Sequence, residues 1–376
     1  MNRILVIYSA RIPSVELFLR TFLEFGRRCK TDIKEMPVMS VRKQDIEWSD
    51  ILLAIRPFEI SAYGIVMSAF KSGRKIFVYL DDDLLHLPDI YSSNLRRLFA
   101  RTTHNSNCTY LERILNICDV LWGSSPYLIE QYKPLVLRGR CECTDICMVT
   151  SATHTEKHND GKIKIVYAGS GNHYVQLNRY IIPALNRLAS NYDLSLTCIG
   201  MRSEYIDDCK VDFHVFPWMN NLEEYNSFMR DQQFDIGVAP VEQDVFHRCK
   251  YFNKYIEYAS LGVIGIYTDD YPYKSVVKNE INGLLSENTI DSWTFNIKYA
   301  IDNPDKCKEM IDNSSSDLLS RFSMNSQVEQ IELRLPELLL ENNSIKEQVR
   351  FAPHYILNKA RKTLNCLVYK YENIKR

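Results

Sequence analysis

Short apolar runs rich in Val, Ile and Tyr alternate along the chain with longer segments in which apolar residues recur at helical spacing. This pattern predicts strands at 3–8, 50–55, 75–80, 120–123, 163–168, 194–199, 234–238 and 263–267. It predicts helices at 14–28, 61–72, 110–117, 180–190, 222–231 and 253–261, with 316–340 helical again. Such alternation is typical of βαβ units, so we expect an α/β fold with parallel sheets.

The alternation occurs in two series, separated by residues 152–162, which are polar and carry no apolar run. We expect Rossmann-like domains at 1–151 and 163–320, the linker between them, a closing helix at 321–345 and a basic tail at 346–376. Ligands of open parallel sheets bind beyond the carboxyl ends of the strands. Two such domains should therefore face each other across a cleft that holds the site.

Composition narrows the class of protein. The chain has 376 residues, of which 45% are hydrophobic and 25% charged, as in ordinary globular proteins. Its 46 Lys and Arg against 47 Asp and Glu give a net charge of −1, so we expect no nucleic-acid partner. The chain has no apolar run of spanning length and no signal peptide, and its 11 cysteines read as reduced thiols. We expect a cytoplasmic protein, either free or peripheral at the inner membrane face.

A glycine-containing turn follows the strand predicted at 163–168. Gly169, Ser170, Gly171 and His173 lie in it, and the backbone amides of such a turn can hold a phosphate. Tyr174 stands where a dinucleotide fingerprint has its third glycine, which disfavours an oxidoreductase. An ordinary turn and a phosphate contact both remain open.

A second candidate lies beyond the strand that ends near residue 239. Lys250, Lys254 and Glu257 are spaced i, i+4, i+7, which would place them on one face of a helix. Two ammonium groups suit a diphosphate, and the carboxylate suits a ribose diol. The alternative is a solvated, salt-bridged helix face.

Two further clusters could hold ligands or metals. Asp81, Asp82 and Asp83 follow a strand, where a carboxylate could orient or deprotonate an acceptor hydroxyl. A solvated loop and a metal site are the alternatives. The spacing of Cys141, Cys143 and Cys147, with His154 and His158, is a poor zinc pattern, so we expect buried thiols and no metal there.

The last 31 residues differ from the rest of the chain. Residues 346–376 carry eight basic and two acidic residues, a net charge of +6, interleaved with Tyr, Ile, Leu and Val. This pattern is typical of a helix that lies on an anionic membrane. Packing against the body, or binding of nucleic acid, would be consistent with the same pattern.

One stretch of the second half resembles retaining glycosyltransferases of the family-4 type, which have the GT-B fold. The matching positions are 235–240, Phe246, Arg248, Lys250, 253–259, 261–263, 272–274, Val277 and 282–285. Looser matches lie at 55–57, 79–84, 167–173 and 196–200. Cys249 departs from the pattern, because many members have a glutamate there.

The resemblance implies transfer of a sugar from a nucleotide-sugar donor to a glycan, lipid-linked or other hydroxyl acceptor, with retention at the anomeric carbon. It implies a hexosyl- or related transferase of polysaccharide, capsule or glycoconjugate assembly, with no obligatory cofactor. The N-terminal domain would take the acceptor and the C-terminal domain the donor. We then expect Asp81, Asp82, Arg248 and Lys254 to be catalytic. The turn 169–173, Lys250 and Glu257 would bind the donor, and a non-catalytic sugar-binding protein of the same fold is the alternative.

Overall fold

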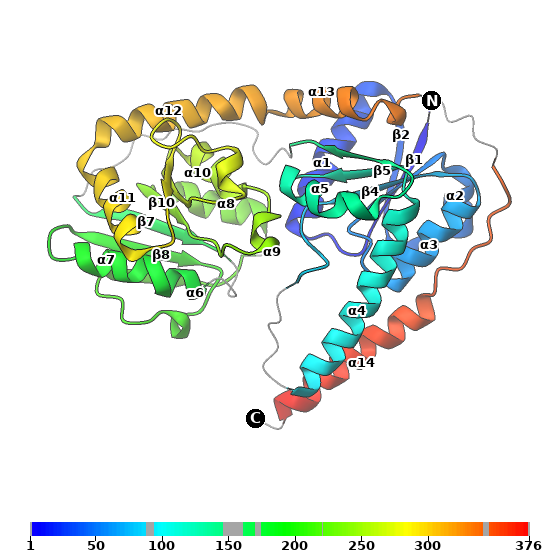
Figure 1. The fold of residues 1–376 in the computed structure, drawn as a ribbon, viewed down its shortest axis with the longest axis horizontal. Coiled ribbons are helices and arrows are strands. Elements are labelled where there is room, and N and C mark those ends of the chain that lie inside the picture. Colours follow the sequence, from blue (N-terminus) through cyan, green and yellow to red (C-terminus); the bar gives the residue numbers. More distant parts are fainter. Residues whose placement is uncertain are drawn as a thin grey trace. The chain divides into compact units, whose positions relative to one another are not determined.

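The computed structural model describes residues 2–87, 94–145, 161–169, 174–219, 221–340 and 346–374. Contacts divide the chain into two compact units (Figure 1). Unit 1 comprises residues 1–146 and 327–376, and unit 2 comprises residues 147–326. The C-terminal 50 residues are therefore part of the same unit as the N-terminus.

Unit 1 is built on a six-stranded parallel sheet of order β2-β1-β3-β4-β5-β6. Its strands are β1 (Arg3–Tyr8), β2 (Asp32–Pro37), β3 (Ile51–Ile55), β4 (Lys75–Leu80), β5 (Val120–Gly123) and β6 (Arg140–Cys143). All five residues of β3 are buried, as expected of a central parallel strand covered on both faces.

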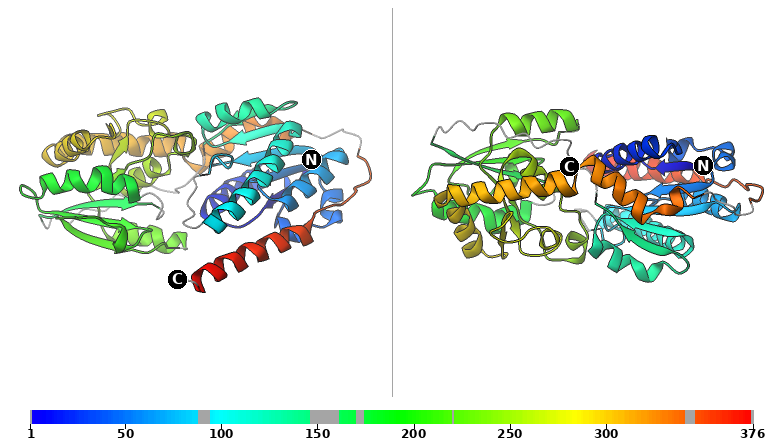
Figure 2. Two further views of the ribbon diagram at one scale, coloured as in Figure 1. Left: turned by 60° about the horizontal axis from the view of Figure 1, so that its bottom comes forward. Right: turned by 90° about the horizontal axis from the view of Figure 1, so that it is seen from above.

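Helices cover both faces of this sheet (Figure 2). They are α1 (Pro13–Cys29), α2 (Lys43–Trp48), α3 (Ile60–Lys71), α4 (Asn94–Ile117) and α5 (Pro126–Tyr132). The amphipathic helix α1 begins with a proline and ends at Lys30 in the left-handed conformation. Its Phe18 ring lies 3.9 Å from the Tyr79 ring and 4.9 Å from the Trp122 ring, and these aromatic contacts attach α1 to β4 and β5.

Unit 2 is built on a second six-stranded parallel sheet, of order β12-β11-β10-β7-β8-β9. Its strands are β7 (Ile163–Ala168), β8 (Leu194–Ile199), β9 (Asp212–Phe216), β10 (Ile236–Ala239), β11 (Ile264–Thr268) and β12 (Leu284–Ser286). The helices are α6 (Tyr174–Gln176), α7 (Ile182–Leu188), α8 (Leu222–Asp231), α9 (Val245–Arg248), α10 (Asn253–Leu261), α11 (Ile290–Asp302) and α12 (Pro304–Arg321). A π-helical segment, Leu177–Ile181, joins α6 to α7.

The C-terminal segment of unit 1 contains α13 (Met324–Arg334) and α14 (Tyr355–Ile374). Arg140 on β6 makes a 2.7 Å ion pair with Glu337, and Lys346 pairs with Asp50. The hydroxyl of Tyr355 donates to the carbonyl of Val38 at 3.0 Å. These contacts incorporate the segment into the unit that the N-terminal residues begin. No helix in the described part of the chain has the length and hydropathy needed to cross a bilayer.

The predicted α/β class with two parallel sheets is confirmed, and every predicted strand lies within one or two residues of an observed one. Some helix bounds were wrong. The helix predicted at 110–117 is the end of α4, which begins at residue 94, and the segment 316–340 is divided between α12, α13 and a short 3₁₀ turn. The pattern missed strands β2, β6, β9 and β12. It also missed helices α2, α5, α9 and α11 and the first part of α12.

Candidate functional site

The topology of unit 2 indicates where a ligand should bind. The chain runs outward from β7 through β8 to β9, then returns to β10 on the other side of β7. Such a reversal of strand order opens a crevice at the carboxyl ends of the two strands that flank it. The carboxyl ends of β7 and β10, at Ala168 and Ala239, therefore border the crevice in unit 2.

At the end of β7, the backbone of Gly169 lies close to the backbone at the end of β8. The amide of Gly169 donates to the carbonyl of Ile199 at 3.0 Å. Gly200 has a φ of 88°, and a Cβ placed on it would lie 2.4 Å from the Gly169 carbonyl oxygen. Position 200 therefore requires a glycine, because its backbone is left-handed and because the carbonyl of Gly169 lies so close. Ser170, Gly171 and His173, predicted to bind the donor, lie outside the described residues.

Lys254 and Glu257 lie together on α10. The Lys254 ammonium donates to Glu257 Oε2 at 2.6 Å and to the hydroxyl of Tyr225 at 3.2 Å. Tyr225 is on α8, and its hydroxyl donates to the other carboxylate oxygen of Glu257. Burial, and then the charge of Glu257, raise the pKa of Tyr225 well above its usual value, so this hydroxyl remains a proton donor. The spacing of the chain could not reveal Tyr225, because it comes from a different helix.

Lys250 departs from the predicted arrangement. Helix α10 begins at Asn253, so Lys250 precedes it and does not share a helix face with Lys254 and Glu257. Its ammonium lies 4.4 Å from the centroid of the Phe246 ring, a cation–π contact that the one-helix interpretation did not include. The short helix α9 ends at Arg248, so Lys250 lies in the segment between α9 and α10.

Arg248 is positioned by a carboxylate that follows the next strand. Its Nε donates to Asp270 Oδ2 at 2.8 Å, and its side chain is about one-third exposed. Asp270 lies two residues beyond the end of β11. The guanidinium is therefore held beyond the carboxyl ends of the strands, where it suits an anionic ligand.

Cys249, next to Arg248, is fully buried. The ring of His247, the residue before Arg248, is 2.8 Å from Asp244, which caps α9. A thiol in this interior position has the role of a small apolar side chain.

A polar contact spans the strand reversal itself. Glu242, in the loop after β10, accepts a hydrogen bond from Gln176 on α6 and lies 3.8 Å from the guanidinium of Arg179. These side chains join the segment that follows β7 to the segment that follows β10. Neither sequence spacing nor charge pattern indicated this connection.

Unit 1 has its own charged group at the carboxyl edge of its sheet. Arg56, just after β3, has a left-handed φ of 49° and donates to Asp81 at 2.9 Å. Its guanidinium lies 4.0 Å from Asp82. This arrangement leaves two carboxylates and one cation where β3 and β4 end.

The side chain of Asp83 is wholly buried, and its contacts differ from those of Asp81 and Asp82. It accepts from the hydroxyl of Tyr132 at 2.8 Å and from the amide of Leu85 at 3.1 Å, and it lies 2.8 Å from the ring of His86. These contacts of Asp83 hold residues 83–86, which follow β4, against Tyr132 of α5. Within the described residues no group of three or more His, Cys, Asp or Glu side chains could hold a metal ion. The possible zinc ligands Cys147, His154 and His158 lie outside that part.

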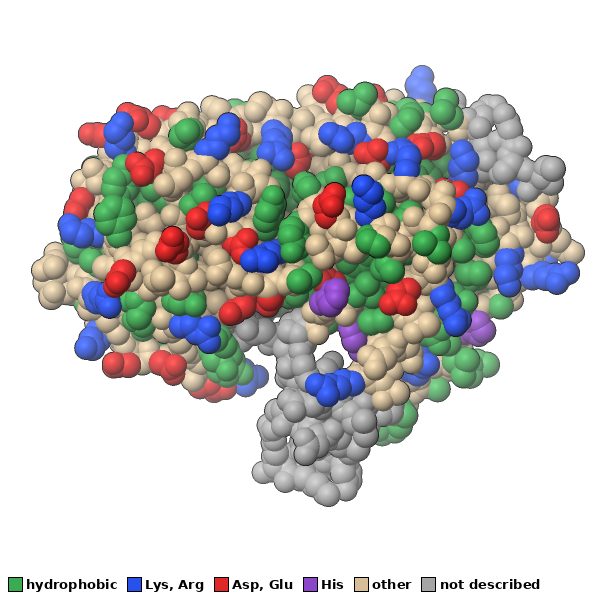
Figure 3. All heavy atoms as spheres, in the orientation of Figure 1, with side chains coloured by type: hydrophobic (Ala, Val, Ile, Leu, Met, Phe, Trp, Pro, Cys, Tyr) green, Lys and Arg blue, Asp and Glu red, His purple; other side chains and the backbone are tan. Residues whose placement is uncertain are grey.

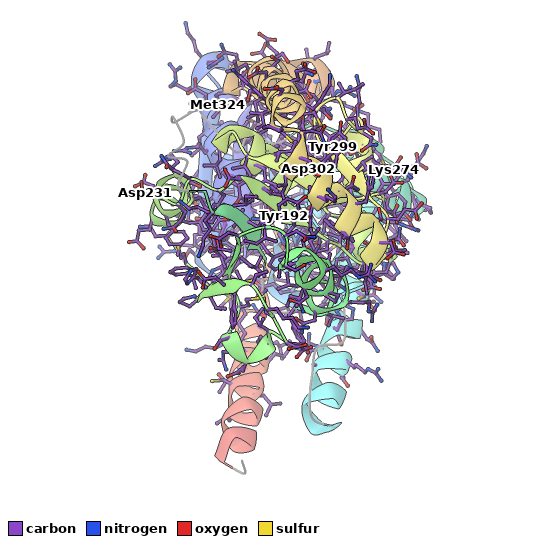
Figure 4. The ribbon with its side chains drawn as sticks, turned by 90° about the vertical axis from the view of Figure 1, so that its left-hand side faces the viewer. Tyr192, Asp231, Lys274, Tyr299, Asp302 and Met324 are labelled. Atoms are coloured by element: carbon purple, nitrogen blue, oxygen red, sulfur yellow. The ribbon has the colours of Figure 1, made fainter. Side chains whose placement is uncertain are left out.

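The opposite edge of the unit 2 sheet also carries polar side chains. An open hollow of ≈ 480 Å³ there is lined by 189–194 and 210–212, at the amino ends of β8 and β9. Tyr192 donates to Asp302 at 2.8 Å, and both belong to an exposed surface (Figure 4). Ligands of parallel sheets bind at the carboxyl ends, so we do not assign the site to this hollow.

The surface charge agrees with the near-zero net charge. On the face drawn in Figure 3, Lys and Arg side chains are interspersed with Asp and Glu side chains over both units. That face presents no broad field of one sign among the side chains drawn in colour.

No family model matches the chain, and the comparison with curated proteins gave no match. Solved structures do match. Sucrose-phosphate synthase from Thermosynechococcus elongatus has a TM-score of 0.63 at 11% identity, covering 89% of this chain and 98% of that one. HepE from Anabaena, in complex with UDP, has a TM-score of 0.63 at 13% identity, covering 89% and 100%. A glycosyltransferase from Rickettsia africae has a TM-score of 0.58 at 14% identity, covering 90% and 98%.

These likenesses extend over both units and over nearly all of each matched protein. At identities of 11–14%, the TM-scores of 0.58–0.63 show a shared fold. The chain therefore has the fold of the GT-B glycosyltransferases, with two parallel-sheet α/β units in tandem.

Proposed function

We propose that the protein is a glycosyltransferase that takes a sugar from a nucleotide-sugar donor. The observation that carries the proposal is the cluster of Tyr225, Lys254 and Glu257 beside the strand reversal of unit 2. An ammonium suits a diphosphate, and a carboxylate suits a vicinal ribose diol. We take uridine diphosphate as the first candidate, because HepE was solved with UDP and with UDP-glucose.

The proposed reaction breaks the bond between the anomeric carbon and the diphosphate oxygen and forms a bond to an acceptor hydroxyl. The acceptor proton leaves with the diphosphate or passes to a carboxylate. Arg248 and Lys254 would stabilise the charge that grows on the diphosphate, which is the electrostatic part of the catalysis. Asp81 or Asp82 would orient the acceptor hydroxyl or remove its proton.

We extend the proposal to the finer properties that the sequence resemblance implies. Transfer would proceed with retention at the anomeric carbon, by a hexosyl- or related transferase that needs no metal or cofactor. The acceptor would be a glycan or a lipid-linked hydroxyl in polysaccharide or capsule assembly, on the cytoplasmic side of the membrane. In support, a mutant of S. aureus TarM, a structure matched over 55% of its length with a TM-score of 0.54, was solved with Fondaparinux, α-GlcNAc-glycerol and UDP, and HepE was solved with UDP and glucose.

Cys249 favours a second candidate, a protein that binds a nucleotide sugar without turnover. Its thiol is buried and replaces the glutamate that the resemblance would place near the sugar. Turnover separates the two candidates, because a binding protein would be stabilised by the donor and release no nucleoside diphosphate.

The test is a thermal-shift screen of UDP-, GDP- and other nucleotide sugars, followed by assay of nucleoside diphosphate release with candidate acceptors. A donor at 100 times its Kd should stabilise the protein by about 2.7 kcal/mol. The Glu257→Gln variant should lose preference for the ribonucleotide over its 2′-deoxy form. If no nucleotide sugar shifts the melting temperature, the proposal is wrong.

A further inference from the structure

Helix α14 presents its apolar residues to solvent. Ile356, Leu364 and Leu367 are 85%, 46% and 57% exposed, and Leu357 is also exposed. Ile356, Ala360, Leu364 and Leu367 are spaced i, i+4, i+8 and i+11, so they form one stripe along the helix. A helix that packs on its own domain normally buries such a stripe.

The opposite, polar side of α14 makes the contacts with unit 1. Asn358 is buried, and its amide donates to the sulfur of Met39 at 3.5 Å. One turn further on, Lys362 makes a 2.9 Å ion pair with Glu59. The guanidinium of Arg361 lies 5.7 Å from the centroid of the Tyr110 ring on α4. Polar and ionic contacts therefore hold α14 against α3 and α4, beside which it runs (Figure 1).

The anchoring also fixes which way α14 faces. Tyr355, Asn358 and Lys362, spaced i, i+3 and i+7, all make contacts with unit 1. Upstream, the amide of Ala352 donates to Ser68 on α3 at 3.2 Å. With these contacts in place, α14 cannot rotate its leucine stripe inward without breaking them.

Charge beside the stripe indicates what covers it. Lys359 is exposed and lies on the helix between the apolar stripe and the anchored side. The segment 346–376 has a net charge of +6 in a chain whose total is −1. An apolar stripe bordered by an exposed lysine, in a segment of net positive charge, suits a bilayer surface with anionic headgroups, where the leucines enter the acyl boundary and Lys359 meets phosphate.

We propose that α14 attaches the protein to an anionic membrane surface through the stripe Ile356, Ala360, Leu364 and Leu367, with the exposed Leu357 beside it. The helix lies flat on the bilayer, and unit 1 is held to it by the polar side of α14. This function of the surface is independent of the proposed sugar transfer, since no residue of the stripe belongs to the carboxyl edge of either sheet.

The test is cosedimentation of the full-length protein with vesicles of mixed phosphatidylglycerol and phosphatidylcholine. We expect binding at low salt that weakens at high salt, because screening shortens the reach of the lysines. The double variant Leu364→Gln with Leu367→Gln should bind at least about tenfold more weakly, since each leucine leaves a contact with lipid. Lys359→Gln should bind about fivefold more weakly to anionic vesicles.

The matched control is Leu137→Gln with Leu333→Gln, two leucines of unit 1 that are 72% and 80% exposed outside α14. This pair should bind vesicles as the wild type does, and both double variants should keep the wild-type thermal shift with a donor nucleotide. Absence of binding at low salt, or equal loss in both double variants, would overturn the proposal. It would also be overturned if the stripe variants abolished self-association of the lipid-free protein, since a second copy would then be the occupant.

Discussion

The two units have sheets of equal size but differ in the charged groups beyond the carboxyl ends of their strands. In unit 1, Arg56 lies with Asp81 and Asp82 where β3 and β4 end, one cation with two carboxylates. In unit 2, Arg248, Lys250 and Lys254 are grouped with Asp270 and Glu257, three cations with two carboxylates, and Glu242 pairs separately with Arg179.

On the proposed function, we assign the donor to unit 2 and the acceptor to unit 1. A diphosphate needs cationic donors, and the group of Arg248, Lys250 and Lys254 would supply three. Sugar hydroxyls donate hydrogen bonds, which the carboxylates of Asp81 and Asp82 would accept. The strand orders of the two units support the same assignment. Unit 2 has three strands on each side of its reversal, as in dinucleotide-binding domains, whereas unit 1 has two on one side and four on the other.

The largest effect should come from neutralising both carboxylates of the Arg56 group in unit 1. Asp81→Asn with Asp82→Asn should lower turnover by about 100-fold, because an amide neither removes a proton nor carries the charge that orients a hydroxyl. UDP affinity, measured by calorimetry, should not change. A variant with wild-type turnover would remove these residues from the reaction, and weakened UDP binding would remove the contrast between the units.

Lys254→Ala should then weaken UDP binding by about 10- to 150-fold, the loss of one charge-assisted contact of roughly 1.5–3 kcal/mol. Binding of uridine, which has no phosphate, should change little. Arg56→Ala in unit 1 is the matched control and should leave the UDP dissociation constant as it is. Equal affinity of the wild type and Lys254→Ala for UDP would exclude Lys254 from the donor site.

A third difference is that unit 1 incorporates the C-terminal segment. A substitution at Gly64 tests how tightly that segment packs against α3. A Cβ on Gly64 in α3 would lie 2.2 Å from the backbone oxygen of Ala352. Gly64→Ala gains helix propensity of about 1 kcal/mol, but overpacking against backbone costs about 1–3 kcal/mol. We expect a lower free energy of unfolding and faster proteolysis within 346–374.

Gly26→Ala in α1 is the control, because its Cβ would meet only the end of the flexible Ile33 side chain, at 2.4 Å. It should be less destabilising than Gly64→Ala. The reverse ranking would mean that residues 346–354 yield easily and do not depend on Gly64.

The accuracy of the sequence interpretation also differs between parts of the molecule. Central strands are buried on both faces, so their apolar runs were visible in the sequence. The four missed strands, β2, β6, β9 and β12, are the four edge strands. Three of them are largely exposed or half-exposed and polar, and β12 has three residues, so none offers a continuous apolar run.

The site shows the same limit. Lys254 and Glu257 were predicted to share one face of a helix, and on α10 they form an ion pair, whereas Lys250, predicted on the same face, precedes the helix. Tyr225, Asp270 and Arg56 reach their partners from other elements, over 22 to 32 positions in sequence, so no local spacing reveals them. The orientation of α14 is likewise set by its contacts with Val38, Met39 and Glu59, which are distant in sequence, and not by its own periodicity.

The smallest predicted effect is a loss of unit 1 stability in acid. Burial would raise the pKa of Asp50, but hydrogen bonds from Lys346 and Arg3 outweigh it and lower the pKa below its ordinary value of 3.8. The hydrogen bond from Arg140 lowers the pKa of Glu337 from 4.5. Asp50, just before β3, pairs with Lys346 of the C-terminal segment, and Glu337 of that segment pairs with Arg140 on β6.

A carboxylate with a lowered folded-state pKa stabilises the protein fully above its unfolded value, and the contribution disappears as the pH falls through the folded value. The contacts should therefore act above about pH 4.5 and weaken below about pH 4. Asp50→Asn with Glu337→Gln should lower the Tm at pH 7 by roughly 2–4 °C, because partly exposed pairs contribute at most about 1 kcal/mol. The gap between wild type and variant should narrow on acidification, since the wild type loses the same charges. A gap that stays constant down to pH 3 would mean that these two ion pairs do not fasten the C-terminal segment to unit 1.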